Sequence, residues 1–164
     1  MKNEEILKKL RDAGDYVSGQ ELCEYYGVSR TAIWKVIRQL EKDGYEIEAQ
    51  NNKGYRLVER EDADLFSKVE IESRLETAWV GRKLVFHSET GSTNLDAKEL
   101  AESGEASGAV VVADMQTAGR GRRGRGWVSP AGKDIYMTIM LRPQCRPEKA
   151  SALTLVMALA VLEA

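Results

Sequence analysis

Nine consecutive residues of this 164-residue chain, from Gly119 to Trp127, comprise four glycines, four arginines and one tryptophan. Glycine lets the backbone adopt positive φ angles and approach a ligand closely. Arginine brings a permanent charge and a planar fork that matches the oxygens of a phosphate or carboxylate. Apolar runs at residues 109–113 and 135–141 flank the segment and are typical of buried strands. The pattern predicts a mobile cationic loop between two core strands, suited to close over a small anion.

Three other interpretations of this loop have to be weighed. Gly119, Gly121 and Gly124 form G-x-G-x-x-G, but a dinucleotide-binding turn must open a helix, and Pro130 and Gly132 oppose one. A disordered RNA-binding tract could also be rich in arginine and glycine, but this stretch is short and lies between apolar strands. A solvated surface loop stays open as an alternative, because runs of charge are usually solvated.

Two motifs in the sequence resemble those of the biotin protein ligases. Residues 116–127, followed by Ser129, Pro130 and Gly132, are similar to that family's ligand-binding loop. Residues 89–94, Glu-Thr-Gly-Ser-Thr-Asn, are similar to a second family motif in which Ser-Thr-Asn opens a helix. The resemblance covers essentially the whole chain. It implies an α+β fold, in which an N-terminal winged helix-turn-helix precedes part of a biotin/lipoate-ligase-like mixed α/β catalytic domain.

The activity implied by this resemblance attaches biotin to a protein in two steps. Biotin and ATP form biotinyl-5′-AMP, and biotin then passes to a lysine of the biotin carboxyl carrier protein of acetyl-CoA carboxylase. Mg²⁺ is expected on the pyrophosphate, although no metal ligand can be assigned in the sequence. The adenylate also acts as a corepressor, which favours a homodimer that binds the palindromic operator DNA of biotin genes.

The resemblance implies roles for individual side chains in this reaction. Arg120, Arg122 and Arg123 are expected to stabilise the adenylate and the charge that develops at phosphorus. Trp127 is expected to form a wall of the pocket, with a place in the hydrophobic core as an equal alternative. The residues implied to bind biotin or the adenylate are Ser92, Thr93, Asn94, Gln116, Gly119, Arg120, Gly121, Arg122, Arg123, Gly124, Arg125 and Trp127.

One family motif, a Lys-Trp-Pro-Asn-Asp-like segment whose lysine works in adenylation, does not occur in this sequence. We therefore expect the chain to be a fragment that lacks ligase activity by itself. The alternative is a DNA-binding sensor of biotinyl-AMP without ligase activity. Lipoate ligase, from the family's wider kin, is a third candidate class, but the arginine loop and the helix-turn-helix both favour biotin.

The first 58 residues have the pattern of a winged helix-turn-helix. Helices are predicted at residues 3–13, at residues 18–26 and from Ser29 to Lys42, and a hairpin, or wing, at residues 45–58. Asn3, Ser18 and Ser29 are the expected N-caps, and Glu21 completes a capping box with Ser18. The second helix is expected to place Leu22, Tyr25 and Tyr26 on one apolar face.

Polar residues of the third helix and the wing are the candidates for contact with DNA. Residues that lie off the apolar stripe of the third helix fall where a recognition helix meets bases and phosphates. A solvated helix face is the alternative, because helix-turn-helix geometry also serves as a protein-interaction scaffold. An exposed Trp34 would be costly unless it touches DNA or a partner. The predicted DNA-binding residues are Ser18, Ser29, Arg30, Thr31, Trp34, Lys35, Arg38, Lys53 and Arg56.

These patterns divide the chain into a winged helix-turn-helix domain at residues 1–60, a linker at 61–66 and an incomplete ligase domain at 67–164. Within the last of these we expect a helix at residues 67–76, a strand at 83–87, and a helix at 92–100 capped by Thr93 or Asn94. The final helix is predicted to begin at Pro147. It is apolar on every side from Ala152 onward and therefore needs to be covered.

Composition limits the remaining function classes. Cys23 and Cys145 have neither disulfide nor metal-ligand spacing, and Cys23 is expected to be buried. His87 is the only histidine and lacks the partners of a nucleophilic triad, so a structural or surface role is expected. The chain has no apolar signal segment, and its 11-residue apolar run at 152–162 is too short to span a bilayer. We expect a cytoplasmic protein that does not contact a membrane.

Overall fold

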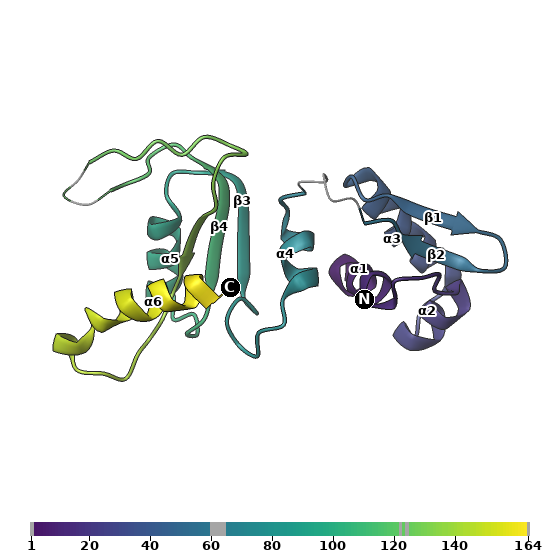
Figure 1. The fold of residues 1–164 in the computed structure, drawn as a ribbon, viewed down its shortest axis with the longest axis horizontal. Coiled ribbons are helices and arrows are strands. Elements are labelled where there is room, and N and C mark those ends of the chain that lie inside the picture. The colour runs from purple at the N-terminus through teal and green to yellow at the C-terminus, as the bar shows by residue number, and fades with distance from the viewer. Residues whose placement is uncertain (1, 60–64, 122, 124, 164) are drawn as a thin grey trace.

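The computed structural model describes residues 2–59, 65–121, 123 and 125–163. Two lobes lie along the long axis, one formed by residues 3–58 and the other by residues 66–163 (Figure 1). A short helix, α4 (Lys68–Arg74), lies between them. Helices and strands are mixed in both lobes, which confirms the expected α+β class.

The first lobe is a three-helix unit followed by a hairpin. It contains α1 (Asn3–Ala13), α2 (Gly19–Tyr26) and α3 (Arg30–Lys42), then β1 (Ile47–Gln50) paired antiparallel with β2 (Gly54–Leu57). The hydroxyls of Ser18 and Ser29 accept hydrogen bonds from the backbone N–H groups of Glu21 and Ala32, which caps α2 and α3. The predicted winged helix-turn-helix is therefore confirmed.

Three local predictions in this lobe are wrong. Lys2, not Asn3, is the N-cap of α1, and the Glu5 carboxylate accepts a hydrogen bond from the Lys2 backbone N–H at 2.8 Å. Tyr25 is 69% exposed, because Tyr26 occupies the inner face of α2 and donates its hydroxyl to the Glu5 carbonyl. Cys23 is only partly buried.

The core of the first lobe holds the wing against the helices. Burial of each large aliphatic side chain contributes roughly 1.5–3 kcal/mol. The backbone of Val17 and Tyr55 exchanges two hydrogen bonds of 2.8 and 2.9 Å, which attaches the wing to the start of α2. The fully buried aliphatic side chains of this core are Ile6, Leu7, Leu10, Leu22, Ile33 and Leu40.

The second lobe is built on a three-stranded sheet in the order β3–β4–β5. The strand β3 (Leu84–Thr90) runs parallel to β4 (Val110–Gln116), and β5 (Tyr136–Ile139) pairs antiparallel with β4. The crossover between the parallel strands contains α5 (Thr93–Glu102), which lies on one face of the sheet while α4 lies toward the other (Figure 1). Backbone pairing thus places the start of α5 near the end of β4.

Element boundaries in this lobe differ from the prediction. Both β3 and β4 extend three residues beyond the predicted strands, to Thr90 and Gln116, because the parallel ladder continues past the apolar runs. Helix α4 ends at Arg74, earlier than the predicted residue 76. The N-cap of α5 is Ser92, so Thr93 and Asn94 are helical residues and not caps.

The junction between the lobes is centred on α4. Leu65 and Val69 pack against the core of the first lobe, whereas Phe66 and Ile71 pack against the core of the second. The linker predicted at residues 61–66 lies mostly outside the described residues, since only Leu65 and Phe66 are described. Packing on both sides makes α4 part of both cores.

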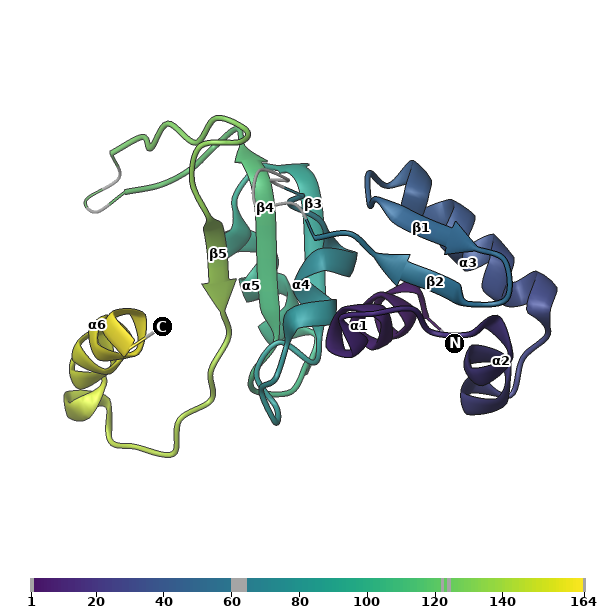
Figure 2. The same ribbon diagram turned by 45° about the vertical axis from the view of Figure 1, so that its right-hand side comes forward.

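The C-terminal segment forms a 3-10 turn at Pro147–Lys149 and then α6 (Ala152–Glu163). None of the residues of α6 is buried, although the helix is apolar on all sides. Figure 2 shows α6 standing apart from the sheet at the end of a long connection. Within the described parts of the chain, no helix is long and apolar enough to cross a membrane.

Candidate functional site

The N-terminus of α5 and the end of β4 meet through one glutamine side chain. The Gln116 Oε1 atom accepts hydrogen bonds from the Thr93 backbone N–H at 2.9 Å and from the Thr93 hydroxyl at 3.1 Å. The Gln116 Nε2 atom donates to the Ser129 hydroxyl at 3.1 Å. Ser92, Thr93 and Ser129 are all at most 3% exposed. The amide of Gln116 therefore joins three segments of the chain in a buried polar network.

Strand β5 adds a further hydroxyl to this network. The Thr138 Oγ1 atom lies 3.0 Å from both the Thr93 Oγ1 and the Asn94 Oδ1 atoms. Neither Thr138 nor Ser129 was predicted as a site residue. Strand alternation could have placed Thr138 on the same face as Tyr136. Ser129 follows Gln116 in the loop motif, but the motif does not show that their side chains are hydrogen-bonded.

A cavity of about 220 Å³ opens beside these hydroxyl and amide groups. Its wall combines polar groups from α5 and β4 with aromatic and aliphatic side chains from β5 and the arginine loop. This mixture suits a small ligand that has a polar head and an apolar body. The lining residues are Thr93, Asn94, Gln116, Arg120, Trp127, Ile135, Tyr136, Met137 and Thr138.

The arginine loop is a hairpin over its described residues. The Trp127 backbone N–H donates to the Gly119 carbonyl at 2.8 Å, and the Gly121 N–H donates to the Arg125 carbonyl at 2.7 Å. A hairpin in this place rules out the helix that a dinucleotide-binding turn requires. Arg122 and Gly124, both predicted to bind the adenylate, lie outside the described residues.

Gly119 is packed too closely for any larger residue. A Cβ atom on Gly119 would lie 2.8 Å from the Trp127 carbonyl oxygen and 2.9 Å from the Ser129 Oγ atom. The base of the loop therefore depends on the absence of a side chain at this position.

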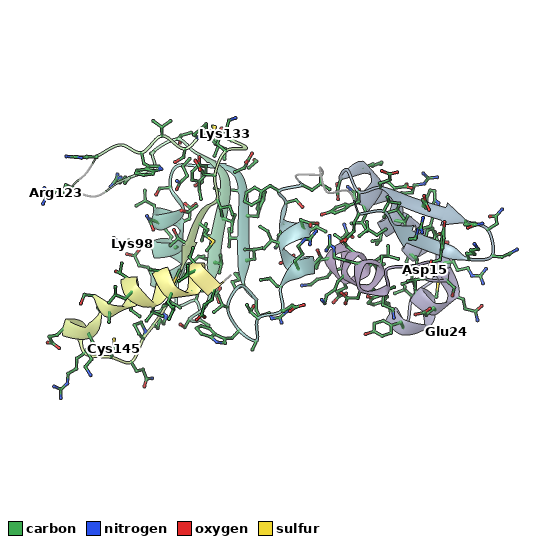
Figure 3. All side chains as sticks on the ribbon, in the orientation of Figure 1. Asp15, Glu24, Lys98, Arg123, Lys133 and Cys145 are labelled. Carbon is green, nitrogen blue, oxygen red and sulfur yellow. The ribbon has the colours of Figure 1, made fainter. Side chains whose placement is uncertain are left out.

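The arginines of the loop do not all face the cavity. Arg120 lines it, whereas Arg123 and Arg125 border a separate hollow of about 480 Å³ with Trp127. Arg123 lies at the outer tip of the loop, pointing away from the sheet (Figure 3).

Trp127 does not belong to the hydrophobic core, so that alternative is wrong. Its side chain is 62% exposed, and its ring packs beside Gly121, where a Cβ atom would lie 3.6 Å from the Trp127 Cε3 atom. Trp127 therefore forms part of the wall between the cavity and the outer hollow of the loop.

A second candidate site lies on the first lobe, between α3 and the wing. A groove of about 560 Å³ is bordered by the starts of α2 and α3 and by the turn of the wing. Ser18, Arg30 and Lys53 line it, and Thr31 and Lys35 are exposed on α3. The hydroxyls of Ser18 and Ser29 are already used as helix caps. The groove thus has one cationic side chain on each side, Arg30 from α3 and Lys53 from the wing.

Trp34 and Arg38 form a pair on the exposed face of α3. Trp34 is 49% exposed, and the Arg38 guanidinium lies 5.5 Å from the centre of its ring. Arg38 also pairs with Glu41 at 3.0 Å. Trp34 therefore lies off the buried face of α3.

Arg56 is held within the wing. Its guanidinium donates to Glu48 at 2.7 Å and stacks 5.0 Å from the ring centre of Tyr16, whose hydroxyl also donates to Glu48. These hydrogen bonds, from Tyr16 first and then Arg56, lower the pKa of Glu48, and the bond to Glu48 raises the pKa of Tyr16. Arg56 is therefore less free to contact phosphate than Lys53. Tyr16 and Glu48 were not predicted as members of this surface.

The fold and the two sites define a winged helix-turn-helix lobe joined to an α/β lobe with a polar cavity beneath an arginine loop. Comparison with protein families agrees with this class. Residues 2–56 match the HTH domain, and residues 86–164 match the Biotin/lipoate A/B protein ligase family. Residues 86–164 are therefore similar to that ligase family, and the residues before them are similar to a helix-turn-helix domain.

Two curated relatives are similar to this chain over most of its length. The Bifunctional ligase/repressor BirA of Bacillus subtilis (strain 168) is 41% identical over 160 residues, which cover 97% of this chain and 49% of that protein. The protein of the same name from Escherichia coli (strain K12) is 35% identical over 150 residues, which cover 92% of this chain and 44% of that protein. The chain thus spans about half the length of these relatives.

Among solved structures, the biotin protein ligase from Leishmania major in complex with biotinyl-5-AMP aligns at 38% identity. That alignment covers 48% of this chain and 32% of the other, with a TM-score of 0.40. The similarity to the family rests instead on the sequence matches, which include residues of both lobes.

Proposed function

We propose that the protein containing this chain is an ATP-dependent biotin protein ligase that also represses biotin genes. The observation that carries the proposal is the cavity of about 220 Å³ at which Thr93, Asn94, Gln116 and Arg120 converge. These residues belong to the two motifs that resemble the biotin protein ligases. The two motifs are separate in the sequence, since Asn94 and Gln116 are 22 positions apart.

In the proposed reaction, the polar network binds biotin and the arginines of the loop stabilise the negative charges of the reactants. Thr93, Asn94 and Gln116, with Ser92 behind them, would hydrogen bond the biotin head, while Trp127 covers its apolar part. The biotin carboxylate then attacks the α-phosphorus of ATP, which forms the mixed anhydride and releases pyrophosphate. Two anions must meet in this step, and the arginines of the loop offset their repulsion. We assign this role to Arg120, Arg122 and Arg123. Further contacts with biotin or the adenylate would come from Gly119, Gly121, Gly124 and Arg125.

The second proposed step transfers biotin to a carrier protein. The amine of an acceptor lysine attacks the acyl carbon of the adenylate and displaces AMP. The lysine would belong to the biotin carboxyl carrier protein of acetyl-CoA carboxylase. A closed loop would shield the mixed anhydride from water before transfer.

Mg²⁺ would accompany the pyrophosphate, since Mg²⁺ is usually held through substrate phosphates. Among the described residues, no three His, Cys, Asp or Glu side chains are grouped so that they could hold a metal ion. No step of the proposal is assigned to a metal ion.

The first lobe would bind operator DNA when the adenylate is present. Side chains of α3 and the wing would contact bases and phosphates from both sides of the groove. The candidates are Arg30, Thr31, Trp34, Lys35 and Arg38 on α3 and Lys53 at the wing. Ser18, Ser29 and Arg56 are weaker candidates because other residues already engage their polar atoms. A cytoplasmic homodimer bound to adenylate would present two such surfaces to a palindrome.

Two measurements on the complete polypeptide that contains residues 1–164 test the proposal. Biotin-dependent release of pyrophosphate from ATP is expected, together with a gel shift of a biotin-gene promoter that strengthens when biotin and ATP are added. Promoter binding that responds to synthetic biotinyl-AMP, without pyrophosphate release, would favour the adenylate sensor instead. Titration with lipoate in place of biotin tests the third class.

A further inference from the structure

Asp96 joins the start of α5 to the end of β3, outside the cavity. Its carboxylate accepts a hydrogen bond from the Thr90 hydroxyl, with 2.7 Å between Thr90 Oγ1 and Asp96 Oδ2. The same oxygen lies 3.5 Å from the His87 Nε2 atom, and the Asp96 side chain is 26% exposed. The carboxylate thus spans the turn at Gly91 and Ser92 that leads from the strand into the helix.

The partner of Asp96, Thr90, also supports the base of the arginine loop. The Thr90 carbonyl accepts hydrogen bonds from the Thr117 backbone N–H at 2.9 Å and from the Thr117 hydroxyl at 3.3 Å. Next to it, the Gly91 carbonyl accepts the Ala118 N–H at 2.8 Å. Thr90 is therefore bonded on one side to the helix and on the other to the residues that lead into the loop.

The start of α5 has few other restraints. Its N-cap, Ser92, makes no side-chain capping hydrogen bond, although such bonds usually fix a helix start. The remaining restraints come from the contacts of Thr93 with Gln116 and of Thr93 and Asn94 with Thr138. A carboxylate in the first turn is also favoured by the partial positive charge at a helix N-terminus.

From these contacts we infer that Asp96 is a positioning residue, which acts through Thr90 to hold Thr93 and Asn94 in register with the base of the arginine loop. Neither Asp96 nor Thr90 lines the cavity. The inference rests on the proposed function only in naming biotin as the ligand. The geometry that Asp96 holds does not depend on that proposal.

The test compares three variants with a matched control in the complete polypeptide that contains residues 1–164. Asp96→Ala and Thr90→Val each remove the hydrogen bond, and both are expected to raise the dissociation constant for biotin roughly tenfold. Asp96→Asn keeps an acceptor oxygen and is expected to bind biotin nearly as the unmodified protein does. Glu99→Ala changes an exposed carboxylate on the same helix and is expected to have no effect.

Isothermal titration and steady-state kinetics give the readouts. A positioning role predicts a larger change in KM for biotin than in kcat, and no additional loss when Asp96→Ala and Thr90→Val are combined. If Asp96→Ala lowers the melting temperature but leaves biotin affinity unchanged, the role is only structural and the inference is wrong. Failure of Asp96→Asn to restore binding would also overturn it, because the Thr90 bond would then not be the cause.

A second readout separates this inference from the proposed function. If the unmodified protein binds no biotin, the proposed function fails, but amide hydrogen exchange can still measure the geometry. Faster exchange at Thr117 and Ala118 in Asp96→Ala than in Glu99→Ala supports positioning by Asp96. Equal exchange in the two variants contradicts it.

Discussion

Arg11 on α1 and Glu70 on α4 form an ion pair between the two lobes. The Arg11 Nη2 atom lies 3.1 and 3.0 Å from the two oxygens of Glu70, and the Arg11 Nη1 atom donates to the hydroxyl of Ser73, which is 1% exposed. Glu70 also accepts the Tyr45 hydroxyl at 2.9 Å. Each lobe thus contributes polar side chains to a single, largely buried network.

We expect Glu70→Gln to lower the free energy of unfolding by about 1–3 kcal/mol at neutral pH. Burial alone would raise the pKa of Glu70, but hydrogen bonds from Arg74 and Tyr45 and the charge of Arg11 outweigh it, so the pKa is lowered. A lowered pKa in the folded state stabilises the protein above the ordinary pKa of glutamate. This contribution is lost as the pH falls through the folded-state pKa.

Urea unfolding at several pH values from 7 down to about 3.5 tests this pH dependence. The loss of stability in acid should be smaller in Glu70→Gln than in the unmodified chain. Glu99→Gln, which changes an exposed carboxylate on α5, serves as the control. Parallel curves for Glu70→Gln and the unmodified chain would show that the pair contributes nothing to acid sensitivity.

Gly54→Ala is expected to destabilise the first lobe by about 2 kcal/mol or more. Gly54 has a φ of 116°, and a Cβ atom would lie 2.0 Å from the Val17 carbonyl oxygen. The wing would have to separate from the start of α2 to make room. Thermal unfolding measures the effect, with Gly19→Ala as the control because its Cβ would make an ordinary contact of 3.6 Å with Tyr55.

Gly119→Ala is expected to weaken biotin binding about tenfold or more, because the added Cβ would clash with the Trp127 carbonyl and Ser129 hydroxyl. Ser129 would then be pushed from Gln116, which removes a bond of the polar network. Gly126→Ala is the matched control in the same loop, since its Cβ would meet nothing within 4 Å. Equal affinity of the two variants in a biotin titration would argue against the cavity as the binding site.

Lys53→Ala is expected to reduce the slope of log K against log salt for DNA binding by about one unit. Arg56→Ala should change the slope less, because Arg56 already forms an ion pair with Glu48, with 2.7 Å between Nη2 and Oε2. Removal of the carboxylate in Glu48→Gln should conversely increase DNA affinity. Fluorescence anisotropy at several salt concentrations tests all three, and Lys98→Ala on α5 is the control. A larger loss from Arg56→Ala than from Lys53→Ala would contradict this order.

The sequence by itself determined the local elements of the first lobe. Apolar residues repeat with helical spacing, Ser18 and Ser29 cap their helices, and Gly14 and Gly27 end theirs in the left-handed conformation. Such signals depend on neighbours within one or two turns, so the winged helix-turn-helix could be predicted. The two motifs that form the cavity were also visible, because family motifs consist of contiguous residues.

Only the tertiary structure decided which distant side chains meet. The bond from Gln116 to Ser129 and the contact of Thr138 with Thr93 depend on strand register and on the path of the loop, which no local pattern encodes. The same holds for Arg11 and Glu70, which are 59 positions apart. The hairpin likewise decides where each arginine of the loop lies, with Arg120 at the cavity and Arg123 at the outer tip. Residues of the same type in one loop can face opposite sides once the loop is folded.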